Sequence, residues 1–144
     1  MTPESLAALH ALAFDEGPRP WTATEFAALL TLETTILATV PAGFALGRVA
    51  LPEAELLTLV VGPSARRRGF GLALVEAFET EAAARGAGEA FLEVAGTNTS
   101  ARALYERLGY RTVGRRPGYY RSAAAAPIDG LILRKRLPPP PKGH

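Results

Sequence analysis

The chain has 144 residues, of which 48% are hydrophobic and 21% are charged, with no cysteine and two histidines. This length and balance favour one globular domain with its own core. The lack of cysteine excludes disulfides, thiolate metal sites and cysteine nucleophiles, and two histidines leave little material for a metal site or a Ser-His-Asp triad. No apolar stretch approaches the roughly 18 residues of a membrane span, and no signal peptide is recognisable. We therefore expect a cytoplasmic domain that binds neither a metal nor a membrane.

The net charge of +2 is unevenly distributed along the chain. Residues 1–63 carry two arginines against seven carboxylates, a balance of −5, whereas residues 64–144 carry fourteen cations against seven carboxylates, a balance of +7. The basic half favours an anionic partner such as a phosphate group or nucleic acid. Since fourteen of the sixteen cations are arginine and alanine is abundant, a compositional bias of the source genome explains the charge about equally well.

The first half of the chain predicts two helices and three strands. Thr2-Pro3-Glu4 is a typical helix start, and apolar residues at helical spacing continue to Phe14. Thr22 and Glu25 form a capping box, which predicts a second short helix. Runs of β-branched and apolar residues predict strands at 34–40, 44–50 and 55–61, the first two joined by a turn. The third run is almost continuously apolar, which indicates a central strand covered on both faces.

The second half predicts helices at 70–84 and 99–108 and strands at 89–95, 110–116 and 129–137. Tyr119, Tyr120 and an alanine-rich loop are expected between the last two strands. Residues 138–144 are proline-rich and then polar, which is typical of a disordered tail. Together the elements predict a single α/β domain over residues 1–137, with a mixed central sheet and helices on both faces.

The segment before the helix at 70–84 carries the most informative motif. Gly62-Pro63 ends a strand and is followed by three arginines and a Gly-Phe-Gly run at 66–71. A helix N-terminus offers unpaired N–H groups and a positive dipole end, glycines let a phosphate approach the backbone, and arginines add fork-shaped donors. The pattern favours a pyrophosphate cradle, and a surface turn with solvated arginines is the alternative. It lacks the lysine of a Walker loop and the third glycine of the dinucleotide fingerprint.

Arg68-Gly69-Phe70-Gly71 also matches the first half of the RNP1 pattern of RNA-recognition strands. The second half of that pattern requires aromatic residues where this chain has Leu72 and Val75. RNP1 must also lie on a strand for its rings to stack on bases, whereas the residues from Leu72 onwards have helical spacing. Nucleic-acid binding is therefore the least favoured reading of this run.

These motifs resemble those of the GNAT superfamily of N-acetyltransferases. Residues 53–71 are similar to the family's motif A, whose Gln/Arg-x-x-Gly-x-Gly signature falls on Arg66, Gly69 and Gly71. The resemblance is closest to the branch of RimI-type ribosomal-protein alanine N-acetyltransferases. The stretches that carry it are Phe91-Leu92-Glu93-Val94, Asn98, residues 103–110 and residues 116–120. The similarity extends over about residues 20–137.

The resemblance implies a GNAT fold with acetyl-CoA as co-substrate and no metal. By this analogy the N–H groups of residues 67–72 bind the pyrophosphate, and the pantetheine arm lies between two strands that diverge near Val61 and Ala95. An N–H group near Val61 would polarise the thioester carbonyl, which stabilises charge in the transition state. The cofactor-binding residues that it implies are Leu59, Val60, Val61, Arg66, Arg67, Arg68, Gly69, Phe70, Gly71, Leu72 and Asn98.

The resemblance also implies two catalytic side chains. Glu93 stands where the branch has its general base, which takes a proton from the attacking amine directly or through water. Tyr105 stands where the general acid protonates the departing thiolate, and a phenol of pKa about 10 is still protonated at neutral pH. Outside that family context, Glu93 reads as a solvated or salt-bridged strand residue and Tyr105 as a core aromatic residue.

The implied activity is acetyl transfer from acetyl-CoA to a primary amine, with a protein or peptide N-terminal α-amine preferred, by direct attack in a ternary complex. Trp21, Tyr119 and Tyr120 are candidates for the acceptor cleft or for packing. Alternatives are an acetyltransferase of a small-molecule amine and a catalytically idle acetyl-CoA-binding domain. We expect the family's usual opening strand to be missing. Ala95 and Ile128-Asp129-Gly130 also depart from the family pattern, which affects the acceptor more than the cofactor.

Overall fold

The computed structural model describes residues 1–13, 20–63, 69–120 and 127–140. Its helices are α1 (Pro3–Ala13), α2 (Ala23–Leu30), α3 (Phe70–Ala84) and α4 (Thr99–Arg107). Its strands are β1 (Thr35–Val40), β2 (Gly43–Ala50), β3 (Glu53–Val61), β4 (Glu89–Ala95), β5 (Arg111–Tyr120) and β6 (Ile128–Arg136). The predicted order of elements is confirmed.

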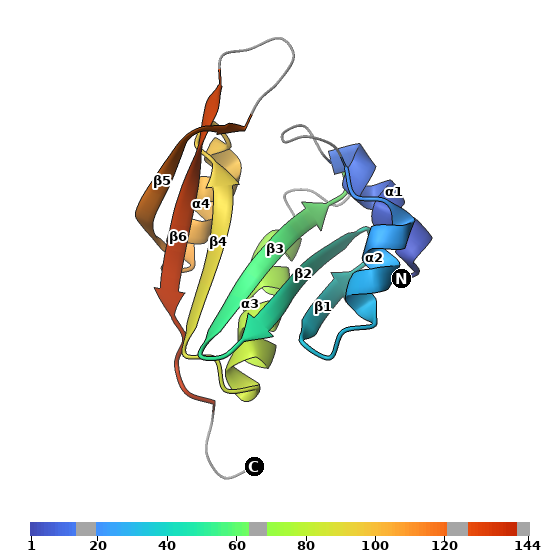
Figure 1. Ribbon diagram of the computed structural model, residues 1–144, viewed down its shortest axis with the longest axis horizontal. Helices are drawn as coiled ribbons and strands as arrows, with labels where there is room; N and C mark the ends of the chain where they lie inside the picture. Colours follow the sequence, from blue (N-terminus) through green and yellow to red (C-terminus); the bar gives the residue numbers. More distant parts are fainter. Residues whose placement is uncertain (14–19, 64–68, 121–126, 141–144) are drawn as a thin grey trace.

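The six strands form one mixed sheet in the order β1-β2-β3-β4-β6-β5. β3 and β4 form the parallel pair at its centre, and the other neighbours are antiparallel. Parallel neighbours need a long crossover connection, which α3 supplies on one face of the sheet. Figure 1 shows β3 and β4 meeting at one end of the molecule and separating toward the other.

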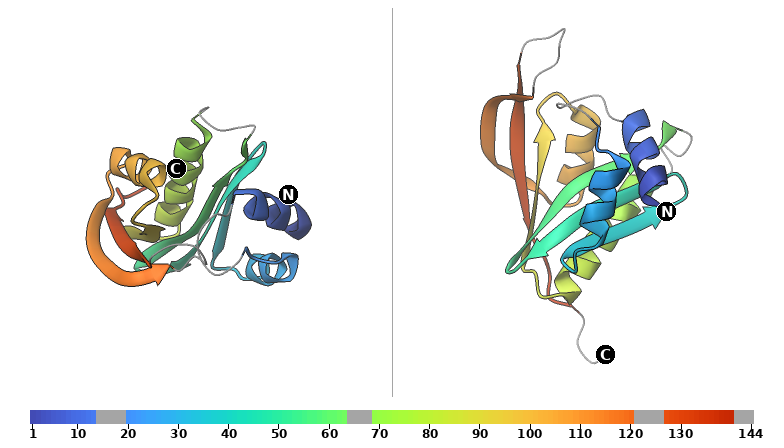
Figure 2. Two further views of the ribbon diagram at one scale, coloured as in Figure 1. Left: turned by 90° about the horizontal axis from the view of Figure 1, so that it is seen from above. Right: turned by 45° about the vertical axis from the view of Figure 1, so that its right-hand side comes forward.

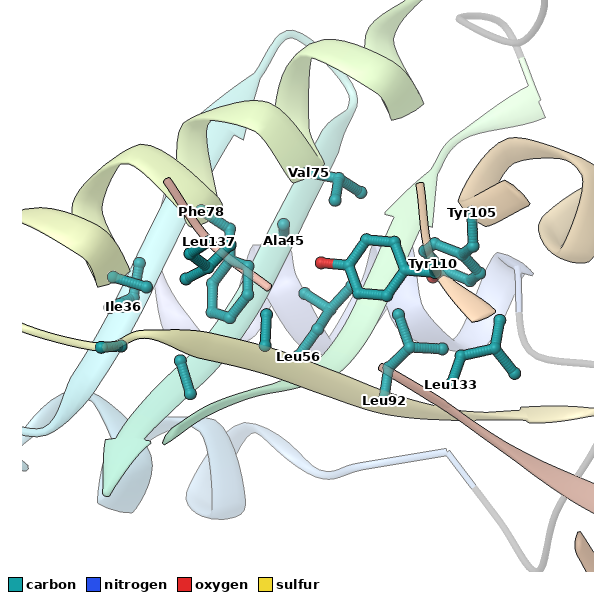
Figure 3. Packing of buried hydrophobic residues seen from close by; sticks show 14 of the residues in the cluster. Ile36, Ala45, Leu56, Val75, Phe78, Leu92, Tyr105, Tyr110, Leu133 and Leu137 are labelled. Carbon is teal, nitrogen blue, oxygen red and sulfur yellow. The ribbon is translucent and has the colours of Figure 1, made fainter. Parts of the chain in front are cut away.

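Helices cover both faces of the sheet, as the sequence predicts. Figure 2 shows α3 and α4 on one face and α1 and α2 on the other. The larger core lies under α3 and α4, and Figure 3 shows part of it, including Phe78, Leu92, Tyr105 and Tyr110. The smaller core joins α1 and α2 to β2 and β3, and its buried members are Leu6, Phe26, Phe44, Leu46 and Val60. Helix α2 begins with the predicted capping box between Thr22 and Glu25.

Strand β3 contains a bulge at Leu57. Leu46 of β2 pairs with Thr58, whereas the next residue, Gly47, pairs with Leu56. Leu57 is therefore an extra residue on β3. A bulge bends its strand and increases the local twist, and bulges are common beside functional sites.

The bulge changes which side chains of β3 face α3. Ala54 and Leu56, before the bulge, belong to the larger core, whereas Leu59 and Val61 pack against that core after it. The ladder between β3 and β4 ends at the same place, with Leu56 and Leu92 as its last pair. Beyond Leu56, β3 follows β2 and no longer pairs with β4. The two central strands therefore diverge toward their carboxyl ends.

The last hairpin differs from the prediction. β5 continues to Tyr120, so Tyr119 and Tyr120 lie within this strand and not in the loop that follows it. The pair Pro117-Gly118 is typical of a turn, which is why the sequence predicts an end near Arg116. Instead, the pairing of β5 with β6 shifts between Arg116 and Tyr120, and the extra residues are accommodated as an irregularity within the strand.

Two further expectations can be compared with the described residues. Phe70 and Gly71 lie in the first turn of α3, so this part of the RNP1-like run is helical and is not on a strand. None of the described helices is long and apolar enough to cross a membrane.

Candidate active site

The diverging end of β3 lies beside the first turn of α3. A methyl group on Gly71 would lie 3.2 Å from Leu104 Cδ2 and 4.0 Å from Val61 Cγ2. The start of α3 therefore contacts both α4 and the last residue of β3. A strand whose edge no longer pairs with one of its neighbours can pair with an extended ligand there, and a helix N-terminus can bind an anion. This arrangement suits a ligand that has an extended polar arm and a phosphate group.

Gly69 gives the N-terminus of α3 its shape. It is the N-cap residue and has φ of +77°, a left-handed conformation that costs a residue with a side chain roughly 1 kcal/mol. The first turn of α3 has neither a side-chain cap nor an acidic residue, so its positive end is not neutralised locally. A methyl group on Gly69 would have no described atom within 4 Å. The predicted contribution of Arg66, Arg67 and Arg68 lies outside the described residues.

Asn98 lies three residues beyond the end of β4, on the diverging side. It is the N-cap residue of α4, and its Oδ1 accepts a hydrogen bond from the Ala101 N–H at 3.2 Å. The Asn98 N–H donates to the Ala95 carbonyl at 3.0 Å, which holds the turn between strand and helix. Asn98 therefore has a structural role in this turn, and its contact with pantetheine stays a prediction.

Glu93 lies on the face of β4 that points away from α3 and α4. Its neighbours Leu92 and Val94 belong to the larger core, and side chains alternate between the two faces of a strand. The Glu93 side chain is 21% exposed, and its Oε1 lies 3.7 Å from Arg116 Nη1. Its Oε2 is buried and has no hydrogen-bond partner among the described residues. Burial raises the pKa of Glu93 above its ordinary value, the Arg116 guanidinium counteracts this in part, and Glu55 adds to it.

Tyr105 lies on α4 and belongs to the larger core, on the other face of β4. It is only 6% exposed, and its ring packs edge-to-face against Tyr110 with 5.8 Å between centroids. Burial raises the pKa of the Tyr105 hydroxyl, and Tyr120 adds to the increase. Tyr105 is therefore both a core residue and a phenol that stays protonated throughout the neutral pH range.

The three aromatic candidates for an acceptor cleft separate into two groups. Trp21 packs in the smaller core, with its ring centroid 5.2 Å from His10 and 5.5 Å from Phe26. Tyr119 is 52% exposed and lies under the Arg116 guanidinium, 5.1 Å from the ring centroid. The Tyr120 ring packs edge-to-face against Tyr119, with 5.1 Å between centroids. Tyr119 is therefore close to Glu93, whereas the contacts of Trp21 are those of a packing residue.

A model of the acetyltransferase (GNAT) family matches residues 6–110. The chain belongs to this family. A curated relative from Escherichia coli, ribosomal protein bS18-alanine N-acetyltransferase, is 42% identical over 79 residues, which is 55% of this chain and 53% of the relative. The chain therefore spans about half the length of the curated relatives that it matches first.

Solved structures extend the similarity. The crystal structure of the ribosomal-protein-S18-alanine N-acetyltransferase from Escherichia coli has a TM-score of 0.79 and 30% identity, and the match covers 100% of this chain and 94% of that one. The crystal structure of nourseothricin acetyltransferase has a TM-score of 0.62 and 28% identity, over 67% of this chain and 58% of that one. This GNAT chain is thus similar both to an enzyme named for a protein substrate and to one named for a small molecule.

The sequence did not identify three residues that surround the candidate catalytic pair. The pairing of β5 with β6, and of β6 with β4, brings Arg116 and Gly130 next to Glu93. The turn after α4 brings the Tyr110 ring against the Tyr105 ring. Cross-strand register depends on the tertiary fold and has no local motif. Residues 111–116 contain three arginines, but the sequence does not indicate which of them contacts Glu93.

Proposed function

We propose that this GNAT-family chain transfers an acetyl group from acetyl-CoA to a primary amine, and that its preferred acceptor is a protein or peptide N-terminal α-amine. The observation that carries the proposal is that the β3–β4 ladder ends at Leu56 and Leu92, whereas β3 continues to Val61 beside the N-terminus of α3. It combines a place for an extended arm with a place for a phosphate.

The described residues fit acetyl-CoA. Main-chain groups of Leu59, Val60 and Val61 would bind the pantetheine arm, because this end of β3 lies beyond its ladder with β4. The N–H groups from Phe70 to Leu72 would bind the pyrophosphate, because the positive end of α3 is not neutralised by an acidic residue. When bound, acetyl-CoA supplies the thioester whose carbonyl carbon the amine attacks.

Glu93 would act as the general base. The amine nitrogen forms a bond to the carbonyl carbon, the carbon–sulfur bond breaks, and the nitrogen loses a proton that Glu93 accepts directly or through water. Burial raises the pKa of Glu93, which makes it a stronger base than an ordinary carboxylate. Arg116 Nη1 lies 3.7 Å from one carboxylate oxygen, and the Glu93 side chain is 21% exposed, so the carboxylate keeps contact with solvent.

Tyr105 would act on the leaving group. Its hydroxyl stays protonated because burial raises its pKa. The pKa of a cysteine thiol is near 8.5, whereas that of an ordinary phenol is about 10, and burial raises the pKa of Tyr105 further. Complete proton transfer from Tyr105 to the thiolate is therefore unfavourable. Hydrogen-bond donation to the sulfur as the negative charge develops is favourable, and it lowers the barrier by the same route as an oxyanion hole.

The α-amine preference rests on acid–base chemistry and on the name of the relative from Escherichia coli. At pH 7.4 an α-amine of pKa about 7.8 is roughly one quarter neutral, whereas a lysine amine of pKa about 10.4 is about one thousandth neutral. A single, partly exposed carboxylate can serve the first amine far more easily than the second.

The test is a peptide that begins with alanine and contains one internal lysine. After incubation with the protein and acetyl-CoA, tandem mass spectrometry should find the acetyl group on the N-terminus. Acetylation of the lysine alone would contradict the α-amine preference. If acetyl-CoA binds but no peptide is acetylated, the chain is an idle binding domain or requires another acceptor.

A small-molecule amine is the second candidate acceptor. The similarity to nourseothricin acetyltransferase supports it, although that match covers 67% of this chain. A panel of primary amines, assayed by release of free CoA thiol, distinguishes the two. Turnover of a small amine at a kcat/KM above that of the alanine peptide would favour this candidate.

A further inference from the structure

The Glu93 carboxylate is packed against a residue that has no side chain. A methyl group on Gly130 would lie 2.5 Å from Glu93 Oε2 and 3.4 Å from Glu93 Cδ. The 2.5 Å separation from Oε2 is far shorter than the roughly 3.5 Å at which a methyl carbon normally sits from another atom. The carboxylate thus occupies the space that a side chain at position 130 would fill.

The register of the sheet explains how Glu93 reaches this space. Ala95 of β4 and Arg116 of β5 are the two cross-strand partners of Gly130, one on each side of β6. Glu93 pairs with Ile132, so Gly130 is its diagonal neighbour on the same face of the sheet. Glu93 therefore leans across β6 toward Arg116, and the two side chains meet at 3.7 Å above a residue without a Cβ atom.

This recess determines the surroundings of both carboxylate oxygens. In the part of the chain that the structure describes, Oε2 is buried in this recess without a hydrogen-bond partner, and Oε1 is directed toward Arg116. The charged groups that act on Glu93 are Arg116 from β5 and Glu55 from β3. The Tyr119 ring closes the recess, since its Cδ2 atom would lie 3.3 Å from a methyl group on Gly130.

We propose that Gly130 is a positioning residue for Glu93: by lacking a side chain it provides the recess that holds the carboxylate beside Arg116 in the orientation used for proton transfer. This inference rests on the proposed function, because it assigns Glu93 as the base. Gly130 itself touches neither substrate nor cofactor in this role. Glycine is not required here for its backbone, because the glycines with positive φ are at other positions among the described residues.

Gly130→Ala is the direct test. The clashing atom is the end of a flexible side chain, so we expect the carboxylate to move into solvent while the fold is retained. Alanine restricts the unfolded chain more than glycine does, so the melting temperature should not fall. With a base displaced by about 1 Å, kcat/KM for the alanine peptide should fall by about 10- to 100-fold, while the KM for acetyl-CoA stays within about twofold.

Gly114→Ala is the matched control. Gly114 lies on β5 opposite Ile132, and its methyl group would be 3.4 Å from Ile132 Cδ1, an ordinary contact with no titratable group. Gly114→Ala should leave kcat/KM unchanged. Combining Gly130→Ala with Glu93→Gln completes a double-mutant cycle. If Gly130 acts through the carboxylate, Gly130→Ala should change the residual activity of Glu93→Gln by less than about twofold.

A second readout does not depend on turnover. The Glu93 side-chain carboxyl carbon can be titrated by carbon-13 NMR in the wild type and in Gly130→Ala, and its pKa should be lower in the variant because the carboxylate gains water. An unchanged Glu93 titration overturns the inference even if the protein has no acetyltransferase activity. An equal loss of activity in the wild-type and Glu93→Gln backgrounds also overturns it. By contrast, full activity of Glu93→Gln alone rejects the base assignment, and with it the role of Gly130.

Discussion

Glu93 and Tyr105 lie on opposite faces of β4. Glu93 points to the exposed face over β6, whereas Tyr105 is in the core with Leu92 and Val94. In a fully paired sheet, these side chains could not act on one group. Since the β3–β4 ladder ends at Leu92, a thioester between the two strands would be accessible from both faces. Under the proposed function the amine arrives on the Glu93 face and the sulfur leaves on the Tyr105 face.

Tyr105→Phe separates catalysis from packing. The substitution keeps the ring in the core and removes the hydroxyl, so stability should change by about 1 kcal/mol or less. If the hydroxyl donates to the leaving sulfur, kcat should fall by roughly 10² to 10³ while the Kd for acetyl-CoA stays within a few-fold. The measurements are kcat, under conditions where chemistry limits the rate, and Kd by calorimetry.

Tyr110→Phe is the matched control for this variant. Tyr110 is buried in the same cluster, and burial and the nearby Glu79 carboxylate raise the pKa of its hydroxyl. Its removal should change kcat by less than about threefold. A folded Tyr105→Phe protein with near-wild-type kcat would remove Tyr105 from the mechanism.

Glu93→Gln tests the base through the pH dependence of the rate. A general base must be deprotonated, so kcat/KM should rise with pH through the Glu93 pKa, which lies above the ordinary 4.5 because of burial. The variant should lose this limb of the profile and most of its activity. Glu89 is an exposed residue of the same strand, so Glu89→Gln should keep both the acidic limb of the pH profile and the activity. An intact acidic limb in Glu93→Gln would assign that limb to another group.

The same substitution has a predicted effect on stability. A carboxyl group whose pKa is raised by folding binds its proton more tightly in the folded state than in the unfolded state. Its ionisation therefore weakens folding as the pH rises through that pKa. Glutamine cannot ionise, so the melting temperature of Glu93→Gln relative to wild type should increase between pH 4 and pH 7. Calorimetric scans of both proteins at several pH values measure this difference.

Gly71→Glu tests the cofactor site. Acetyl-CoA at a hundredfold excess over its Kd should stabilise the wild type by about 2.7 kcal/mol, since it binds only the folded state. A glutamate at position 71 places a negative charge in the first turn of α3 and should abolish this shift. Gly88→Glu adds the same charge at an exposed glycine with open space around it and should keep the shift. Thermal scans with and without acetyl-CoA compare the three proteins.

His10 should make the smaller core sensitive to acid. Its Nδ1 accepts a hydrogen bond from the Trp21 N–H at 3.0 Å, and burial lowers its pKa, although Glu25 acts in the opposite direction. In the unfolded chain, His10 binds a proton below about pH 6.5. Its contribution to stability is therefore complete above that pH and is lost as the pH falls through the lower pKa of the folded state.

The measurement is the melting temperature of wild type and His10→Asn between pH 7.5 and pH 5. Asparagine offers an acceptor oxygen for the Trp21 N–H but does not titrate in this range. The wild type should lose more stability than the variant on acidification. Equal losses would place the acid sensitivity elsewhere in the chain.

Local sequence was sufficient for the order and type of the helices and strands, although not for the end of β5. The capping box at Thr22 and Glu25 depends on a few neighbouring residues and is present at the start of α2. Periodicity separated helix from strand, because the two repeats differ, and it placed Tyr105 on the buried stripe of α4. The resemblance to the GNAT family then indicated Glu93 and Tyr105 as a pair.

What only the tertiary structure decided is how these residues meet. The bulge at Leu57 and the early end of the β3–β4 ladder were invisible in an apolar run that reads as an ordinary central strand. The extension of β5 to Tyr120 was hidden by Pro117-Gly118. The contact of Glu93 with Arg116 across Gly130 joins three strands of the sheet, β4, β5 and β6. A one-residue change in register would send each of these side chains to the opposite face, and register is set by the packing of the whole sheet.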